Sequence, residues 1–535
     1  MALTKVSGQG IGSIDTDGTI KLDGNYPTGT NNVALGNEAL DDGSLSGGAN
    51  TAIGQRALTA NQDGAFNVAV GANALLSNVS GDGNTAVGEE SLFNNTASNN
   101  TGVGRDSLRS NTTGAENVSI GAFSLDANTT GANNVAVGRN ALSGNTTAGS
   151  NTAVGDSALF SNTTGAGNTA VGEGALIANT TGASNVGIGD NALASNTTAS
   201  SNIAIGLNAG DAITTSPANT LVGHNAGSAI STGNGENVCI GNNAGAVMTT
   251  GQQNVFVGDQ AGAGAAVTGA ANTFVGDNAG HTLTSGAENV AVGAAALDAI
   301  TTGSNNVAIG DDALTTNTTA GDNVAVGRNA LGLNSTGNNN TSVGNFAGYN
   351  VTTGIENVFV GSYAGNNSPE TTTGSYNTIL GRLAHGSGQT VSSEVVIGFN
   401  AAGKGTGTAF IAGGNGAFQG NNSSSWSTTS DQRVKKNIVD NNVGLDVINQ
   451  IQVKNFEYRT ADEITELDGS LCAIKKEGTQ IGVIAQEMQE ILPETVKIES
   501  TGCMSVNPDN LTWHLVNAVK ELSAKVAELE ARLGE

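Results

Sequence analysis

The sequence repeats one short phrase about twenty times. Residues 151–167 read NTAVGDSALFSNTTGAG, and residues 168–184 read NTAVGEGALIANTTGAS. A phrase of the form N-x-A-V-G, or a near relative, begins at intervals of 17 residues, with occasional intervals of 16, 18 or 20, from Asn32 to Asn377. A last copy begins at Glu394. A period this short indicates a solenoid in which each repeat forms one coil.

Each repeat predicts one coil of β-structure. The phrase NVAVG is typical of a short strand that ends at Gly, NAL or SAL is expected to be a second short extended piece, and NTTG has turn chemistry. Seventeen residues are too few for a strand–helix–strand unit, which needs about 30. With about 4.8 Å between coils, 22 coils would form a rod about 100 Å long. We expect the repeated Asn to stack into a ladder and the Gly to occupy the tight corners.

The predicted strand is apolar on both faces. In NVAVG the two Val side chains point one way and the Ala the other, because successive side chains alternate across a strand. A wall that faces water would carry polar residues on one of these faces. We therefore expect an oligomer whose chains run side by side, and an isolated solenoid with a plain apolar wall is the alternative.

The copies vary in a correlated way. Most contain Ala-Leu, but seven contain Ala-Gly, as at Ala244-Gly245. The middle strand residue is bulky after most of the Gly copies, as at Phe256, eleven residues after Gly245. Because a close-packed core conserves volume, we expect the Leu/Gly site to touch the middle strand site of the next coil, within a chain or across chains. The exception is Ala291, which follows Gly280.

Composition limits the function further. The net charge is −26, and only 9 of the 20 Lys and Arg lie before residue 430, which argues against a nucleic-acid partner. The three cysteines are scattered, so we expect neither a disulfide framework nor a zinc site nor a need for an oxidising compartment. The start MALTKVSGQGIG lacks an apolar signal core, and we expect no membrane insertion. We also expect no metal and no cofactor.

The repeat region, residues 32–398, resembles the left-handed parallel β-roll heads of trimeric autotransporter adhesins, which contain similar N-x-V-A-I-G phrases. The resemblance implies three chains and says nothing about the ligand. Residues 399–429 then form a cap or tip linker, which carries the candidate receptor contacts Phe410, Phe418 and Trp426. Solenoids need caps, whereas exposed aromatic residues mark binding surfaces.

The C-terminal part, residues 430–535, has a different composition. GTQIGVIAQEMQEILPETV is typical of a strand followed by an amphipathic helix, and LTWHLVNAVKELSAKVAELEARLGE contains a heptad seam. With SDQRVKKNI, GVIAQEMQEILP and SVNPDNLTWHLVNAVKEL, this part resembles the self-cleaving intramolecular chaperone of phage tailspikes and tail fibres. The resemblance implies a small α+β domain that ends in a coiled coil, aligns three chains and then cuts itself off.

The resemblance also implies the chemistry of the cut, which would fall between Thr429 and Ser430. Ser430 would be the nucleophile that attacks the preceding carbonyl, and Lys435 would be the general base, which requires it to be neutral. The remaining motif residues are expected to position the reacting groups; they are Asp431, Arg433, Lys436 and Asn437.

Together these features predict a mainly β, homotrimeric phage tail fibre that attaches the virion to a host-surface receptor, either a glycan or a surface protein. Residues 1–31 are expected to join it to tail or baseplate proteins. The localisation would be the virion, after synthesis in the host cytoplasm. The alternatives are a bacterial trimeric surface adhesin, which would need a signal peptide and a C-terminal membrane barrel, and an ice-binding solenoid, which its paired threonines suggest.

Overall fold

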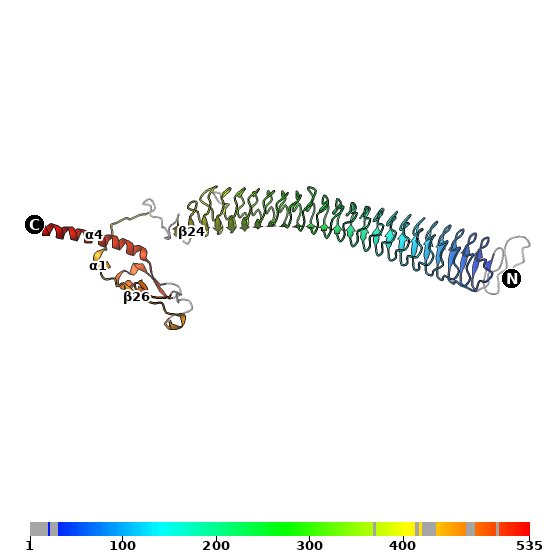
Figure 1. Cartoon of the computed structure of the whole chain (residues 1–535), viewed down its shortest axis with the longest axis horizontal. Helices are drawn as coiled ribbons and strands as arrows, with labels where there is room; N and C mark the ends of the chain where they lie inside the picture. The colour runs from blue at the N-terminus through cyan, green and yellow to red at the C-terminus, as the bar shows by residue number, and fades with distance from the viewer. Residues whose placement is uncertain are drawn as a thin grey trace, which may run out of the picture. The chain divides into compact units, whose positions relative to one another are not determined.

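The computed structural model describes residues 20–21, 30–366, 371–411, 417–419, 435–466, 477–498 and 502–534. The chain divides into two compact units, residues 1–428 and 429–535. The first unit is a regular β-solenoid, and the second is a small α+β domain with a long terminal helix (Figure 1).

The solenoid consists of parallel three-residue strands, and each strand pairs in register with the strand of the next coil, as Thr152, Thr169 and Val186 do. Strand β1 (Ile20–Lys21) pairs with the first of them. The strands of the coils are β2 (Val33–Leu35), β3 (Thr51–Ile53), β4 (Val68–Val70), β5 (Thr85–Val87), β6 (Thr101–Val103), β7 (Val118–Ile120), β8 (Val135–Val137), β9 (Thr152–Val154), β10 (Thr169–Val171), β11 (Val186–Ile188), β12 (Ile203–Ile205), β13 (Thr220–Val222), β14 (Val238–Ile240), β15 (Val255–Val257), β16 (Thr273–Val275), β17 (Val290–Val292), β18 (Val307–Ile309), β19 (Val324–Val326), β20 (Thr341–Val343), β21 (Val358–Val360), β22 (Thr378–Leu380) and β23 (Val395–Ile397). These are the parallel coils that the repeat predicts.

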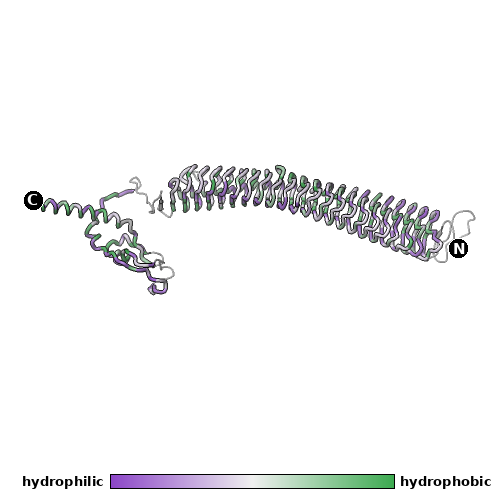
Figure 2. The backbone as a smooth tube through the Cα atoms, in the orientation of Figure 1, coloured by the Kyte–Doolittle hydropathy of each residue, from purple (hydrophilic) through white to green (hydrophobic). Residues whose placement is uncertain are grey.

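The middle residue of each strand points into the coil. Ala153 and Ala170 are fully buried, while the first and third residues of their strands are only partly buried. Hydrophobic, neutral and hydrophilic segments of the backbone recur along the rod (Figure 2). The interior is narrow because the inward residue is usually Ala, and its other wall is the buried Ala-Leu pair of the same coil, such as Ala158-Leu159.

The Ala-Leu segment is not extended, contrary to the expectation of a second extended piece. It is a run of turns in which every second residue is left-handed: φ is +139° at Gly155, +58° at Ser157 and +53° at Leu159. Gly is required at the first of these corners. A Cβ at Gly155 would lie 2.6 Å from the carbonyl carbon of Gly172 in the next coil, a distance that no side chain tolerates. The alternation turns the chain sharply enough to close a 17-residue coil.

The Asn that opens each repeat forms the predicted ladder. Asn168 donates its backbone N–H to Oδ1 of Asn151 (2.9 Å) and its Nδ2 to the carbonyl of Gly182 (2.9 Å). Its own Oδ1 accepts the backbone N–H of Asn185 (2.9 Å). These side chains are fully buried, so the ladder satisfies polar backbone groups that the interior would otherwise leave without partners.

A second buried ladder was not predicted. The Asn of NTTG is buried rather than exposed in a turn, and Nδ2 of Asn179 donates to Oδ1 of Asn162 (2.8 Å) and to the carbonyl of Gly182 (3.0 Å). This ladder ends where Ile213 replaces the next Asn, and among the described residues Oδ1 of Asn196 is left buried without a hydrogen-bond partner. The sequence did contain a signal for this burial. The Asn of NTTG is replaced by Ile, Met, Val or Leu mainly in the repeats whose Ala-Leu pair is Ala-Gly, and an apolar replacement indicates a buried position.

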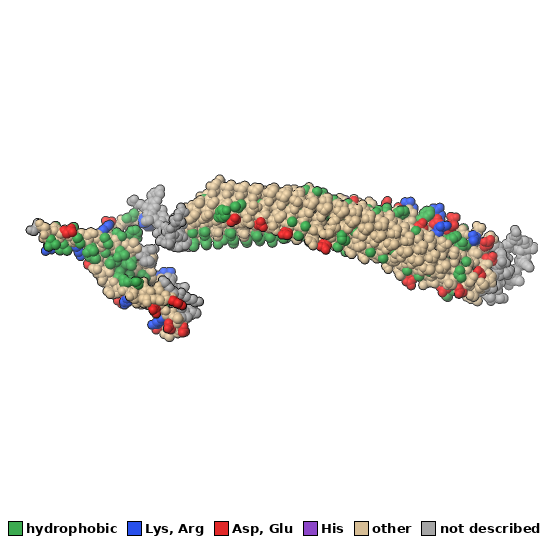
Figure 3. Space-filling view, in the orientation of Figure 1, with side chains coloured by type: hydrophobic (Ala, Val, Ile, Leu, Met, Phe, Trp, Pro, Cys, Tyr) green, Lys and Arg blue, Asp and Glu red, His purple; other side chains and the backbone are tan. Residues whose placement is uncertain are grey.

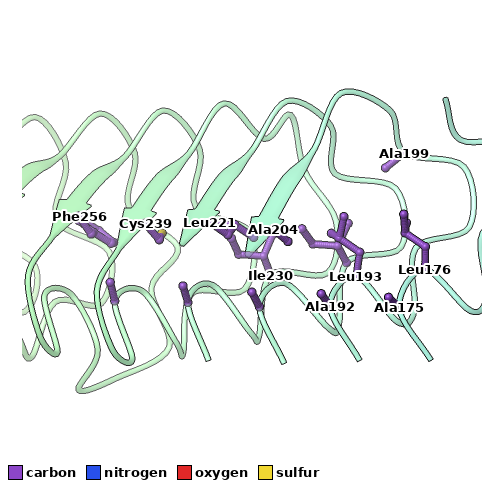
Figure 4. Close-up of a cluster of buried hydrophobic side chains, with 14 of the residues drawn as sticks. Ala175, Leu176, Ala192, Leu193, Ala199, Ala204, Leu221, Ile230, Cys239 and Phe256 are labelled. Atoms are coloured by element: carbon purple, nitrogen blue, oxygen red, sulfur yellow. The ribbon is translucent and has the colours of Figure 1, made fainter. Parts of the chain in front are cut away.

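The volume exchange between Leu/Gly and strand sites is confirmed, and it occurs within one chain (Figure 4). A Cβ at Gly245 would lie 3.2 Å from the ring of Phe256 in the next coil, and a Cβ at Gly262 would lie 2.7 Å from the same ring. A bulky strand residue therefore fills the space above the Gly of its own coil as well as the space left by the preceding Gly. This explains the exception at Ala291, because Phe274 already covers Gly280.

The solenoid ends at a modified rung. Glu394 takes the place of the ladder Asn and is fully buried; its two carboxylate oxygens accept the backbone N–H groups of Ser387 (2.9 Å) and Gly405 (2.8 Å). Strand β24 (Ala409–Ile411) adds one more parallel rung, and β25 (Ala417–Gln419) pairs with it antiparallel. The reversal ends the parallel stack, as a cap would.

The second unit is built around its terminal helix. Its elements are α1 (Leu445–Ile448), β26 (Lys454–Phe456), η2 (Ala461–Glu463), β27 (Gln480–Gly482), α3 (Ala485–Ile491), η3 (Pro493–Thr495), β28 (Val496–Ile498), β29 (Met504–Val506) and α4 (Pro508–Leu533). Strands β26 and β27 pair antiparallel, as do β28 and β29. The predicted succession of strand and amphipathic helix is confirmed by β27 and α3, which buries Met488.

The cysteines differ from the expectation in one respect. Cys239 is a free, buried thiol inside the solenoid, but Cys503 is disulfide-bonded. Its partner lies outside the described residues.

Candidate functional site

The outer face of the strands is an apolar stripe along the whole solenoid. From β2 to β23 the first strand residue is always Val, Ile or Thr, and the third is always Val, Ile or Leu. Several third-position side chains remain more than a third exposed, such as Ile188 (37%) and Ile205 (38%). Figure 3 shows a row of hydrophobic side chains along the lower edge of the C-terminal half of the rod. The alternation expected from NVAVG is confirmed, with Ala inside and Val outside.

This stripe carries no register information. Neighbouring rungs present nearly the same side chains, and no charged residue occurs at either outward position in strands β2 to β23. If another chain packs on the stripe, it can shift along the solenoid by one coil, about 4.8 Å. Each of its side chains then meets a Val or Thr equivalent to the one that it contacted before. Sheet pairings with such uniform patterns slip easily, so alignment must come from elsewhere in the chain.

The terminal helix α4 offers a second apolar surface. The predicted helix is confirmed, and its heptad residues are all exposed in the single chain. The seam consists of Leu515, Val519, Leu522, Val526, Leu529 and Leu533. An apolar heptad seam on a solvent-exposed helix is typical of a coiled-coil partner surface.

The residues expected at the cut lie only partly within the described chain. Thr429, Ser430, Asp431 and Arg433 are outside the described residues. Lys435, Lys436 and Asn437 are described, and all three are exposed. The single chain therefore does not supply the burial that a neutral lysine base requires.

Lys435 lines a cavity of about 1050 Å³ beside α4, together with Glu494, Trp513, His514 and Lys520. Three polar side chains of α4 border the same cavity and hold the segment that follows Lys435. Nδ2 of Asn517 donates to the carbonyl of Asn441 (2.6 Å), and the ring Nδ1 of His514 lies 3.1 Å from the carbonyl of Val443. Oε2 of Glu521 accepts the backbone N–H of Leu445 (3.0 Å).

Sequence reasoning missed these three residues. Their spacing could have identified them, because positions 514, 517 and 521 lie on one face of a helix. That face is distinct from the seam, whose residues begin at Leu515.

Of the candidate receptor contacts, only Phe410 has a described side chain. Phe410 is half-buried against the solenoid core, and Nζ of Lys404 lies 4.7 Å from the centre of its ring. Its Cα partner across the β24–β25 pair is Phe418, whose side chain lies outside the described residues, as does Trp426. The packing of Phe410 favours the capping role for this residue.

Three further observations concern the chemistry of the described residues. Burial raises the pKa of the Cys239 thiol to about 12. Over the described ranges, no three His, Cys, Asp or Glu side chains are grouped as metal ligands would be. Within the same ranges, no helix is both long and apolar enough to cross a membrane.

Comparison with known proteins identifies a family match in the C-terminal unit. No curated protein matches the chain. Residues 430–497, which contain the Lys435 segment, β26, β27 and α3, match the sequence model of the family described as the chaperone of endosialidase. The C-terminal unit thus carries an intramolecular chaperone domain of the chaperone-of-endosialidase type, which implies that the chain forms a trimer.

Proposed function

We propose that this chain is the tail fibre protein of a phage, a homotrimer that attaches the virion to the surface of the host cell. The observation that carries the proposal is the combination of a long solenoid with an apolar outer stripe and a chaperone-of-endosialidase domain at its C-terminal end. A solenoid of this length can extend from the virion toward a cell surface. The chaperone domain brings three chains together, so that the apolar stripe of each chain can be covered by its neighbours.

The two apolar surfaces have different roles during assembly: the outer stripe holds the shafts together, and the seam of α4 aligns the three chains. The stripe provides adhesion between shafts, since burying the exposed remainder of one Ile or Val stabilises by about 1 kcal/mol and the gain recurs at every coil. The seam of α4 provides alignment, because a shift of one helix by a heptad would leave two of its six seam residues without partners. The domain first brings three chains together, and the shafts then pack from that end without a coil shift.

The proposed function includes self-cleavage after assembly. The hydroxyl of Ser430 attacks the carbonyl carbon of Thr429 while Lys435 accepts the hydroxyl proton, and the new Oγ–C bond replaces the C–N bond. The released nitrogen takes that proton and becomes the amino terminus of the C-terminal fragment. Water then hydrolyses the ester, which leaves a carboxylate on Thr429 and restores the serine hydroxyl. Removal of the clamp makes assembly irreversible.

The other proposed roles follow the same scheme. Asp431, Arg433, Lys436 and Asn437 position the reacting groups, and neighbouring chains supply the burial that exposed Lys435 lacks in a single chain. Residues 1–31 join the fibre to tail or baseplate proteins. The end of the shaft with Phe410, Phe418 and Trp426 approaches a glycan or protein receptor, and the assembled fibre is part of the virion.

A size comparison on denaturing gels tests this proposal. The wild-type chain, boiled after expression, should lose a fragment of about 11 kDa, in proportion to the share of residues 430–535 in the 52.9 kDa chain. Ser430→Ala and Lys435→Ala should stay whole, and Ser427→Ala is the matched control that should still be cut. A wild-type chain that remains intact as a stable trimer would remove the self-cleavage step but leave the chaperone role.

A further inference from the structure

The helix that carries the trimer seam also holds the segment that carries Lys435. We define the Lys435 segment as residues 435–445. Asn441, Val443 and Leu445 of this segment bind α4 through backbone atoms, and the α4 partners are the side chains of His514, Asn517 and Glu521. Backbone recognition fixes the path of the chain whatever its side chains are.

The contact is tight. Because a carbonyl oxygen only accepts, Nδ1 of His514 must carry the hydrogen that binds Val443, and Nε2 then lies 3.5 Å from Oε1 of Glu494. The His514 side chain is buried, with a residue exposure of 4%. A Cβ at Gly444 would lie 2.8 Å from Cδ of Glu521 and 3.1 Å from the backbone nitrogen of Ala518. Gly444 is thus the residue that lets the segment approach the helix so closely.

The two faces of α4 connect assembly to the segment. The seam residues Leu515, Val519 and Leu522 interleave along the helix with His514, Asn517 and Glu521, but at 100° per residue the two sets point in different directions. Packing three seams together rigidifies the helix, and a rigid helix fixes the backbone to which it is hydrogen-bonded.

We propose that His514, Asn517 and Glu521 are positioning residues for the self-cleavage, which hold the Lys435 segment in place once α4 has joined the coiled coil. The inference rests on the proposed function, because it assigns these residues to that cleavage. Misplacement of a catalytic group by about 1 Å costs up to about a hundredfold in rate, so their loss is expected to slow cleavage rather than assembly.

The test follows cleavage of the full chain over time in cell-free synthesis, with each variant also made in a Ser430→Ala background to measure trimer formation and melting on native gels. Glu521→Ala removes the acceptor for Leu445, and Asn517→Asp replaces a donor with a carboxylate that faces two carbonyls. Both should cleave about ten- to a hundredfold more slowly while the uncut trimer forms and melts normally. Glu521→Gln keeps an acceptor oxygen and should restore cleavage to within a few-fold of wild type.

Glu528→Ala is the matched control, since Glu528 is one heptad beyond Glu521 and past the segment. Wild-type rates in Glu521→Ala and Asn517→Asp would overturn the inference, and so would a loss of trimer that parallels the loss of cleavage. If the wild-type chain itself stays whole, the proposed self-cleavage has failed, and the positioning role fails with it. The two failures can be told apart on the gel. An uncut wild-type chain rejects self-cleavage, whereas equal cleavage of the wild type and the variants rejects only the positioning role.

Discussion

The ring of Phe274 occupies the space above Gly280, six residues later in the same coil. A Cβ at Gly280 would overlap three carbons of the ring, and the φ of +58° at Gly280 is the same left-handed conformation that Leu297 adopts (+54°) in the next coil. The interior of a coil can thus be packed in two ways. Either a small residue at the middle strand position accompanies Leu six residues later, or a large residue there accompanies Gly.

The first prediction is that these two sites are energetically coupled. Phe274→Ala alone should destabilise by about 3–5 kcal/mol through the cavity it leaves, and Gly280→Leu alone should destabilise by overpacking. The double variant reproduces the Ala291/Leu297 coil and should recover most of the loss, as a double-mutant cycle on thermal unfolding would measure. Additive losses would show that the two sites do not share volume.

The second prediction concerns the first Asn ladder. Asn168→Ala should destabilise by about 1–3 kcal/mol, because the buried N–H of Asn185 loses its acceptor, while the carbonyl of Gly182 keeps only the donor Asn179. Thr181→Ala, at an exposed turn position nearby, is the control and should change stability by less than about 0.5 kcal/mol. Urea unfolding of the shaft is the measurement, and equal midpoints for the two variants would contradict the ladder's role.

The third prediction concerns the thiol of Cys239. Its pKa of about 12 and its full burial leave almost no reactive thiolate near pH 8, so alkylating reagents should label it only after denaturation. A Thr181→Cys variant supplies an exposed thiol on the same shaft and should react within minutes. Peptide mass spectrometry distinguishes the two sites, and rapid labelling of Cys239 in the native fibre would mean that the coil interior is open.

The fourth prediction concerns the outer stripe. Ile188→Glu places a carboxylate on the stripe of each of three adjacent shafts, where like charges cost several kcal/mol. The fibre should melt at a clearly lower temperature, or its shafts should separate while the terminal domains stay trimeric. Thr181→Glu adds the same charge on a turn and should leave the trimer unchanged in light scattering and melting. Equal behaviour of both variants would place the stripe outside the interface.

The local pattern determined much of the architecture. The coil, the inward Ala, the Asn ladder and the Leu/Gly exchange follow from a 17-residue period, since each is repeated many times and must satisfy the same packing in every copy. The left-handed turns at Ser157 and Leu159 were not predictable from propensity, because Leu avoids positive φ on its own and accepts it here only to fill the coil. The buried Asn179 was missed for a similar reason, since an Asn beside Thr-Thr-Gly is ordinarily a turn residue.

The sequence by itself determined that this protein is a β-solenoid followed by a chaperone domain with a heptad helix, because periodicity and ordered motifs are local properties of the chain. Only the tertiary structure decided that His514, Asn517 and Glu521 meet the backbone of residues 441–445, some 70 positions earlier. The spacing of positions 514, 517 and 521 marks one polar face of a helix, but which segment that face holds depends on how separate segments pack. The partners are backbone atoms, so the identity of residues 441–445 carries no signal of the contact.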